Sequence, residues 1–162
     1  MEAYEVTQAL MSVGTVYHVR RRRSEDVLFA IKGELMSPTP RFQLVEGQGD
    51  GDAEPVAQLV GNFIKTRYEI QVGGEAVGSV TFPAVAFKKT LSLAVGAERY
   101  EADGGVFRGV FRCTNERGEV ALEIAKELSI RDTFVVKPTE AMPLAVGLLA
   151  AVAIHSRFYE MV

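Results

Sequence analysis

The stretch LAVGLLAAVAIHSRF, residues 144–158, decides the fold of this 162-residue chain. Between Met142 and Ile154 it contains no charged side chain and no side chain that forms hydrogen bonds. Thirteen residues of helix span only about 20 Å, whereas the apolar core of a bilayer is about 30 Å thick. The length therefore favours a helix buried in a protein core, with a membrane segment or an oligomer interface as the alternatives.

The residues around this run indicate where the helix begins and ends. Thr139 suits an N-cap, and the carboxylate of Glu140 suits the positive end of the helix dipole. Pro143 is tolerated only near the first turn, and Arg157 suits the negative end. We therefore predict a core helix over about residues 140–159. Since none of its faces is polar, other parts of the chain must surround it on every side.

Most of the remaining sequence alternates between apolar and polar residues. In TRYEIQV, residues 66–72, the apolar side chains of Tyr68, Ile70 and Val72 share one face. The segments TLSLAV and EVALEIA repeat this pattern further along the chain. Because successive side chains of a strand point to opposite faces, each segment is predicted to form a half-buried strand.

Turn-forming residues separate these strands, and no helical stretch does. Gly73–Gly74, Asp103–Gly105 and Glu116–Gly118 each stand between alternating segments, as in β-hairpins. By the same criteria we count about twelve strands between Tyr4 and Lys137. A sheet with only hairpin connections is antiparallel, and closing it protects its edges. The predicted fold class is mainly β (α+β): a closed antiparallel barrel with a central buried C-terminal apolar helix that fills its interior.

The chain length fits a single barrel domain, residues 1–162. Within it, the segment that begins RFQLVEG resembles the segment that begins VFRCTNERG, with Phe42 matching Phe111. Each copy has the pattern strand, turn, strand, short link, strand. This similarity predicts two pseudo-repeated halves, about residues 2–72 and 75–137.

Composition and charge bear on the location and on the class of partner. The net charge is -3 and aromatic residues are not interleaved with basic ones, which argues against nucleic-acid binding. Cys113 is the only cysteine, so no intramolecular disulfide can form. The N-terminus lacks the basic start and apolar stretch of a signal peptide. We therefore expect a cytoplasmic protein.

Two basic segments are candidate anion sites. Four consecutive arginines follow a predicted strand, where either they form a solvated turn partly neutralised by Glu25 and Asp26, or their guanidinium groups bind phosphate. Two lysines follow the apolar segment FPAVAF, which forms either a strand with a solvated bend or a contact with a lipid surface. The candidate ligands are Arg20, Arg21, Arg22, Arg23, Lys88 and Lys89.

No sequence motif predicts catalysis, a metal or a cofactor. The two histidines, His18 and His155, and the single thiol of Cys113 show no spacing typical of a nucleophile or a zinc site. The segment GDGDAE, residues 49–54, alternates oxygen donors but lacks the distal bidentate glutamate of an EF-hand. We predict no catalytic residues, and Cys113 is expected to be an inert side chain in a strand.

Two segments carry a resemblance to a known family. EIAKELSIRDTFVVKP, residues 123–138, and LAVGLLAAVAIHSRFYE, residues 144–160, resemble the LURP-one-related branch of proteins with the Tubby C-terminal-like fold, which is similar to phospholipid scramblases. The resemblance implies a twelve-strand barrel around its C-terminal helix. One departure is His155, where we expect an acidic residue after the apolar run.

The function expected from this resemblance is a non-enzymatic binding or scaffold module, peripheral at a membrane. It implies an anionic phospholipid head group or a protein as the partner. Lipid translocation of the scramblase type, or an enzyme with an unrecognised site, are the alternatives.

Overall fold

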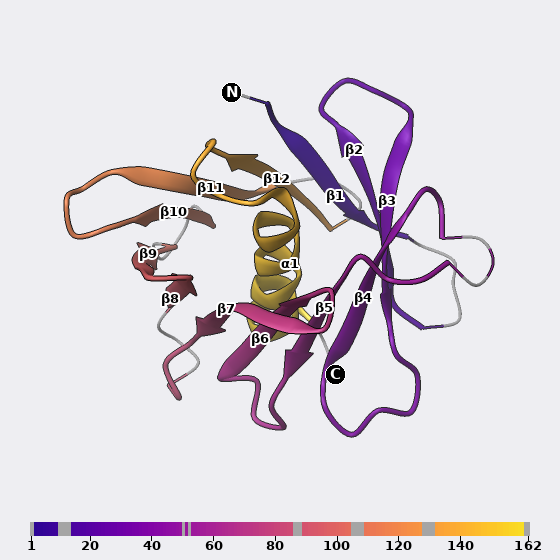
Figure 1. Cartoon of the computed structure of the whole chain (residues 1–162), viewed down its shortest axis with the longest axis horizontal. Helices are drawn as coiled ribbons and strands as arrows, with labels where there is room; N and C mark the ends of the chain where they lie inside the picture. Colours follow the sequence, from indigo (N-terminus) through magenta and orange to yellow (C-terminus); the bar gives the residue numbers. More distant parts are fainter. Residues whose placement is uncertain are drawn as a thin grey trace.

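The computed structural model describes residues 2–9, 14–49, 51, 53–85, 89–104, 109–127 and 132–160. It contains twelve strands followed by a helix at the C-terminus (Figure 1). The strands are β1 (Tyr4–Gln8), β2 (Val16–Arg21), β3 (Val27–Gly33), β4 (Arg41–Glu46), β5 (Ala57–Gly61), β6 (Arg67–Val72), β7 (Glu75–Thr81), β8 (Thr90–Val95), β9 (Glu98–Asp103), β10 (Val110–Thr114), β11 (Val120–Glu127) and β12 (Thr133–Pro138). The helix is α1 (Leu144–Ile154), which continues into a π-helical turn, η1 (His155–Tyr159).

The twelve strands close into one antiparallel barrel, as predicted. Each strand pairs with its neighbours in sequence, and β1 pairs with β12, with Tyr4 opposite Val136. The two-residue turn at Gly73 and Gly74 has positive φ at both positions, 60° and 83°, which explains the pair of glycines there. Closure leaves no strand of this sheet with an unpaired edge.

The apolar helix fills the barrel, which confirms the predicted core helix. In Figure 1, α1 runs down the middle of the ring of strands. Every residue from Val146 to Ile154 is buried, and the side chains from Leu148 to Ile154 are at most 1% exposed. The alternating strand residues supply the surrounding wall, so that Tyr68 and Ile70 on β6 are fully buried. Within the described residues, none of the helices has the length and apolar character needed to cross a bilayer.

A glycine lets the helix approach the wall closely. A Cβ atom on Gly147 would lie 3.1 Å from Cδ1 of Leu122 and 3.5 Å from Cγ1 of Val136. These two side chains belong to β11 and β12, which precede the helix in the chain. At this position the helix therefore lies close against the two strands that precede it.

The helix begins later than the sequence predicted. Pro143, not Thr139, occupies the N-cap position, and α1 starts at Leu144. The backbone N–H and the hydroxyl of Thr139 instead donate to the carbonyl of Ala121, which extends the pairing beyond β12. Because a residue before proline is disfavoured in helical conformation, Met142 cannot continue a helix into Pro143. The predicted position of Glu140 in the first helical turn is therefore wrong.

The two similar sequence segments occupy opposite sides of the ring. The first forms β4, β5 and β6, and the second forms β10, β11 and β12, six strands further round the closed order. Phe42 and Phe111 are each the second residue of their strands, and both are buried. Tyr68 and Phe134 have the same relationship on β6 and β12.

The barrel has two ends, which differ in what they carry. We call the end at which the helix terminates the exit end. It includes the β3–β4 connection (34–40), the β5–β6 connection (62–66), the described part of the β7–β8 connection (82–85 and 89) and residues 155–160. The entry end, where α1 begins, contains the connections that follow even-numbered strands. In Figure 1 the exit end is at the bottom.

Candidate functional site

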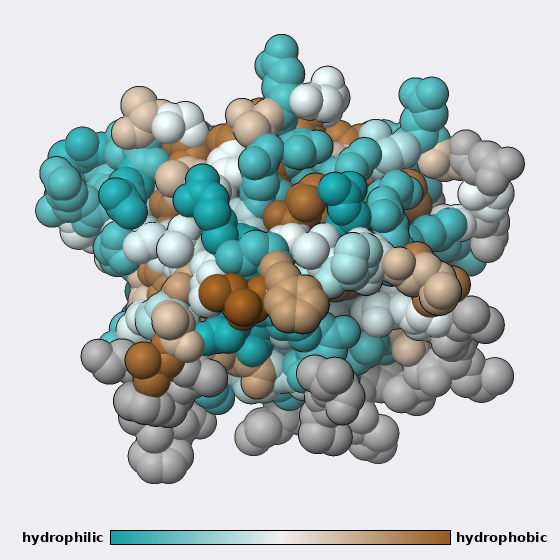
Figure 2. Space-filling model, turned by 90° about the horizontal axis from the view of Figure 1, so that it is seen from below, coloured by the Kyte–Doolittle hydropathy of each residue, from teal (hydrophilic) through white to brown (hydrophobic). Residues whose placement is uncertain are grey.

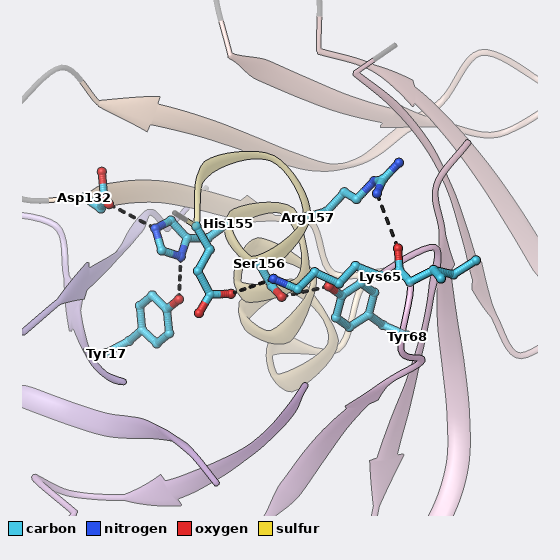
Figure 3. A network of polar contacts seen from close by, with 9 residues as sticks. Tyr17, Lys65, Tyr68, Asp132, His155, Ser156 and Arg157 are labelled. Carbon is cyan, nitrogen blue, oxygen red and sulfur yellow. Dashed lines mark hydrogen bonds and ion pairs between the residues drawn. The ribbon is translucent and has the colours of Figure 1, made fainter. Parts of the chain in front are cut away.

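A buried histidine links the end of the helix to the barrel wall. His155, only 1% exposed, is the first residue of η1. Its Nδ1 lies 2.6 Å from the hydroxyl of Tyr17, and its Nε2 lies 3.0 Å from Oδ2 of Asp132 (Figure 3). A carboxylate only accepts, so Nε2–H donates to Asp132, and in the neutral imidazole Nδ1 then accepts from the Tyr17 hydroxyl. The acidic group that we expected at position 155 is thus supplied by Asp132, next to β12.

Asp132 is a shared acceptor for two donors. The ammonium of Lys126 lies 3.3 Å from its Oδ1, opposite the oxygen that accepts from His155. Burial alone would raise the pKa of Asp132, but the hydrogen bonds from His155 and Lys126 outweigh it and lower this pKa. The carboxylate therefore stays ionised at neutral pH, and its stabilising contribution is lost only as the pH falls through this lowered pKa.

A second hydrogen bond secures the next residue of the turn. The Oγ atom of Ser156 lies 2.7 Å from the hydroxyl of Tyr68, on β6 (Figure 3). Burial raises the pKa of Tyr68 to about 12 and raises that of Tyr17 well above its usual value. Both phenols are therefore neutral across the physiological range. Two tyrosines from β2 and β6 thus brace the helix end from two sides of the barrel.

The hydrogen bonds of Tyr17 and Tyr68 should contribute differently to the free energy of unfolding. Tyr17→Phe leaves Nδ1 of His155 buried without a partner, which should lower the free energy of unfolding by about 1–3 kcal/mol. Tyr68→Phe should cost less, because the freed Ser156 hydroxyl can rotate to a helix carbonyl. Urea unfolding of both variants measures the difference. If Tyr68→Phe lost as much stability as Tyr17→Phe, or more, then leaving Nδ1 of His155 without a partner would not be the larger cost.

A recess lies beside this network at the exit end. It has a volume of about 530 Å³ and is lined by Gln8, Thr15, Lys126, Asp132, His155, Tyr159 and Glu160. Its charged groups are largely paired: Lys126 with Asp132, and Glu160 with Lys65 at 3.4 Å. Both nitrogens of His155 are already engaged in hydrogen bonds within the protein. Among the described residues no three His, Cys, Asp or Glu side chains are grouped as metal ligands.

The predicted cations do not gather at one place. Arg20 and Arg21 end β2, and Arg22 and Arg23 form the turn after it, at the entry end. Lys89 immediately precedes β8 at the exit end, where its ammonium lies 3.4 Å from the hydroxyl of Tyr159. Lys88 lies outside the described residues. The structure therefore separates the arginine run from Lys89 by the length of the barrel.

Two of the four arginines are held in ion pairs. Nε of Arg21 lies 3.4 Å from Glu2, and Nη1 of Arg22 lies 2.7 Å from Glu127. The second pair joins the turn after β2 to the last residue of β11, which lies beyond β1 and β12 in the closed strand order. Arg23 adopts a left-handed conformation with φ of 68° in the exposed turn. Exposed pairs of this kind contribute little stability, so an external anion could displace them.

Sequence reasoning missed most of a group of exposed apolar side chains at the exit end; of its members, only Val85 lies in the segment FPAVAF that we considered for contact with lipid. Leu35 and Met36 are 59% and 100% exposed, Phe63 and Ile64 are 78% and 62% exposed, and Val85 is 46% exposed. The other exposed large apolar side chains, Val56, Val72 and Val120, lie at the entry end and are only 36–39% exposed. We name the first five the apolar rim. Figure 2, which views the molecule from below, shows brown side chains in separate places among teal ones.

A signal for the rim is present in the sequence. The pairs Leu35–Met36 and Phe63–Ile64 stand between turn residues, after Gly33 and Gly61 and outside any alternating segment. Two adjacent apolar residues in a connection have no strand face to bury them. A recess of about 330 Å³ lies between these two pairs, with Glu160 on its lining.

Comparison with known proteins supports the architecture. No protein-family model matches the chain, and no curated protein sequence matches it significantly. An X-ray structure of a protein from Arabidopsis thaliana is similar in fold, with a TM-score of 0.57. The match covers 94% of this chain and 88% of the plant protein, at 13% sequence identity. At that identity the similarity shows the fold alone: a barrel of the kind built here by twelve strands around a C-terminal helix.

Proposed function

We propose that the protein is a non-enzymatic binding module of the LURP-one-related, Tubby-like class that docks on anionic phospholipid surfaces through its exit end. The observation that carries the proposal is the apolar rim. Its five side chains project from three neighbouring connections, and none is needed to fill the core. The plant structure supports the class only through its fold.

The arrangement of the rim suits a fluid surface. The rim residues come from three different connections, and apolar side chains seen from this end stand as tips among polar ones (Figure 2). A rigid protein partner would need a matching pocket for each tip, whereas a bilayer interface accepts apolar side chains wherever they enter it. Burying one Phe or Met side chain is worth about 1.5–3 kcal/mol. Several tips together can therefore hold the molecule at an interface.

The charges favour the same orientation. At the exit end, close to the rim, the cations Lys65, Lys89 and Arg157 balance the carboxylates of Glu34, Asp132 and Glu160. Among the described residues at the entry end and the adjoining N-terminus, carboxylates outnumber the cations Arg20, Arg21, Arg22, Arg23 and Arg117; they include Glu2, Glu25, Asp26, Glu54, Glu116, Glu119 and Glu140. An anionic membrane repels this acidic end, which turns the rim towards the lipid.

The polar network at the helix end supports a binding module rather than an enzyme. The groups that resemble catalytic ones, His155, Asp132 and Tyr17, are engaged in mutual hydrogen bonds. Tyr17 is 1% exposed, so it cannot reach a substrate without opening the barrel. The network therefore fixes the end of the helix, which forms part of the exit end.

Vesicle cosedimentation tests the proposal. The wild type should bind vesicles of phosphatidylcholine with phosphatidylserine weakly and in a salt-sensitive manner, and should bind pure phosphatidylcholine less. Met36→Ser combined with Phe63→Ser should reduce the binding at least about ten-fold, because two exposed tips lose their apolar surface. The matched control is Val72→Ser combined with Val120→Ser at the entry end, which should bind like wild type.

A second variant separates the two candidate docking ends. Changing Arg20, Arg21, Arg22 and Arg23 to serine removes the arginine run at the entry end and leaves the rim intact. This variant should keep most of the vesicle binding. If it lost binding while the rim variant kept it, the arginine run would be the docking site. If the wild type did not bind vesicles of any composition, this result would contradict lipid docking and favour a protein partner.

A further inference from the structure

Arg157 connects the helix end to two different loops. Its Nη2 lies 2.8 Å from the carbonyl oxygen of Pro83 and 3.3 Å from that of Ala84. Its Nη1 lies 3.4 Å from the carbonyl oxygen of Ile64. Figure 3 shows this guanidinium reaching from the helix end to the loops at the barrel wall. One side chain thus donates to the β5–β6 and the β7–β8 connections at once.

The carbonyls that Arg157 contacts belong to two of the connections that carry the apolar rim. Ile64 is itself a rim residue and follows Phe63, while Val85 directly follows Ala84. A second contact strengthens one of these connections, because Lys65 pairs with Glu160 at 3.4 Å. The helix end therefore holds the backbone of two of the three rim connections.

The π-helical turn places Arg157 where it can do this. The backbone N–H of Glu160 donates to the carbonyl of His155 at 2.7 Å, which closes a turn wider than that of an α-helix. His155 and Ser156, at the start of this turn, are fixed to Tyr17 and Tyr68. The base of the Arg157 side chain is therefore anchored by neighbours on both sides.

Arg157 is not placed to bind a lipid phosphate. Its two terminal nitrogens face backbone carbonyls, and its Nε is buried, with no partner among the described atoms. A guanidinium that received a phosphate would have to release these carbonyls. Its contacts point to backbone positioning instead.

We infer that Arg157 is a positioning residue for membrane docking. It holds the loops of Phe63, Ile64 and Val85 in place, so that these side chains reach the membrane surface at the same depth and enter the lipid interface together. The inference rests on the proposed function. Loops that are ordered before binding lose less conformational entropy on docking, so fixing them raises the affinity. The third rim connection, with Leu35 and Met36, receives no contact from Arg157 among the described residues and serves as an internal reference.

The experiment uses the full chain and two variants of Arg157. Arg157→Gln removes the charge and the forked donor, whereas Arg157→Lys keeps the charge and removes only the fork. Both should bind vesicles of phosphatidylcholine with phosphatidylserine about two- to ten-fold more weakly than wild type, since loop ordering then occurs on binding. Arg112→Gln, an exposed arginine on β10, is the control for loss of one charge and should bind like wild type.

An environment-sensitive fluorophore then reports which tips enter the lipid. It is attached to Phe63→Cys or to Met36→Cys, while the native Cys113, 1% exposed, stays unlabelled. In both Arg157 variants, the vesicle-induced blue shift should decrease at position 63 and remain at position 36. A structural defect of the whole barrel would reduce both shifts equally.

The outcomes separate the inference from the proposal on which it rests. A wild type that does not bind vesicles refutes the proposed docking itself. A wild type that binds, with Arg157→Lys showing wild-type affinity and a full shift at position 63, refutes the positioning role and leaves only a charge effect. If Arg157→Gln does not fold, Arg157→Lys decides alone. Its backbone amides at residues 62–66 and at Phe82, Ala84 and Val85 should exchange hydrogen faster than in wild type, and unchanged exchange refutes the inference.

Discussion

Replacing Ala151 by lysine should unfold the protein. Ala151 is fully buried in the middle of α1, where the ring of strands surrounds the helix on every side. A lysine there would bury an ammonium without a partner in a space sized for a methyl group. The cost should consume most of a total stability of about 5–15 kcal/mol. Expression followed by thermal unfolding should give an aggregated or unfolded product.

Two comparisons make this result specific to the core. Leu148→Ala, also fully buried, should fold but lose about 2–5 kcal/mol, the usual range for a buried leucine. Ala97→Lys, in the exposed β8–β9 turn, introduces the same side chain and should melt like wild type. If Ala151→Lys and Ala97→Lys melted at the same temperature, the helix would not be the core of the barrel.

Most of the barrel could be predicted because its pattern is local. A strand with one buried face repeats every two residues, and this period is visible in segments such as β6 and β8 without knowledge of any partner. Closure followed from the apolar helix, since a helix without a polar face has to be enclosed. The one local error, the start of α1, came from weighing the capping residues Thr139 and Glu140 above the constraint of Pro143.

The polar network could not be predicted, because its members are distant in sequence. His155 and Tyr17 lie 138 residues apart, and Ser156 and Tyr68 lie 88 residues apart. Only the register of β2 and β6 around the helix brings these hydroxyls to the helix end. The departure of His155 from the acidic residue we expected was visible, but its partner Asp132 was not.

Most of the apolar rim at the exit end was missed for a related reason. The arginine run is conspicuous in the sequence, yet Arg21 and Arg22 meet carboxylates from other parts of the chain. The exposed pairs of the apolar rim are inconspicuous, because each contributes only two residues to its connection. They form a surface only when three connections meet around the helix terminus. Which exposed residues come together at one surface thus depends on topology more than on composition.

Alkaline solution should destabilise the protein strongly between pH 9 and pH 12. Cys113 and Tyr68 are buried in the barrel, and burial raises the pKa of the thiol and that of the phenol to about 12. In the unfolded chain these groups ionise near 9 and 10. Stability from a raised pKa is complete below the unfolded value and is lost as the pH rises towards the folded value. A pKa that differs by one between the folded and unfolded chain corresponds to about 1.4 kcal/mol, which gives losses of roughly 4 kcal/mol for Cys113 and roughly 3 kcal/mol for Tyr68.

Two variants show how much of this loss of stability comes from the thiol of Cys113 and how much from the phenol of Tyr68, because the two groups ionise in different pH ranges. The free energy of urea unfolding, measured from pH 8 to pH 11.5, should fall in wild type from about pH 9 onwards. Cys113→Ala should remove the decline that begins near pH 9. Tyr68→Phe should leave that part intact and reduce only the decline above pH 10, to which the buried Tyr17 also contributes. An unaltered slope between pH 9 and pH 10 in Cys113→Ala would show that the thiol ionises without unfolding. The barrel interior around β10 would then have to admit water, contrary to the packing of the helix within it.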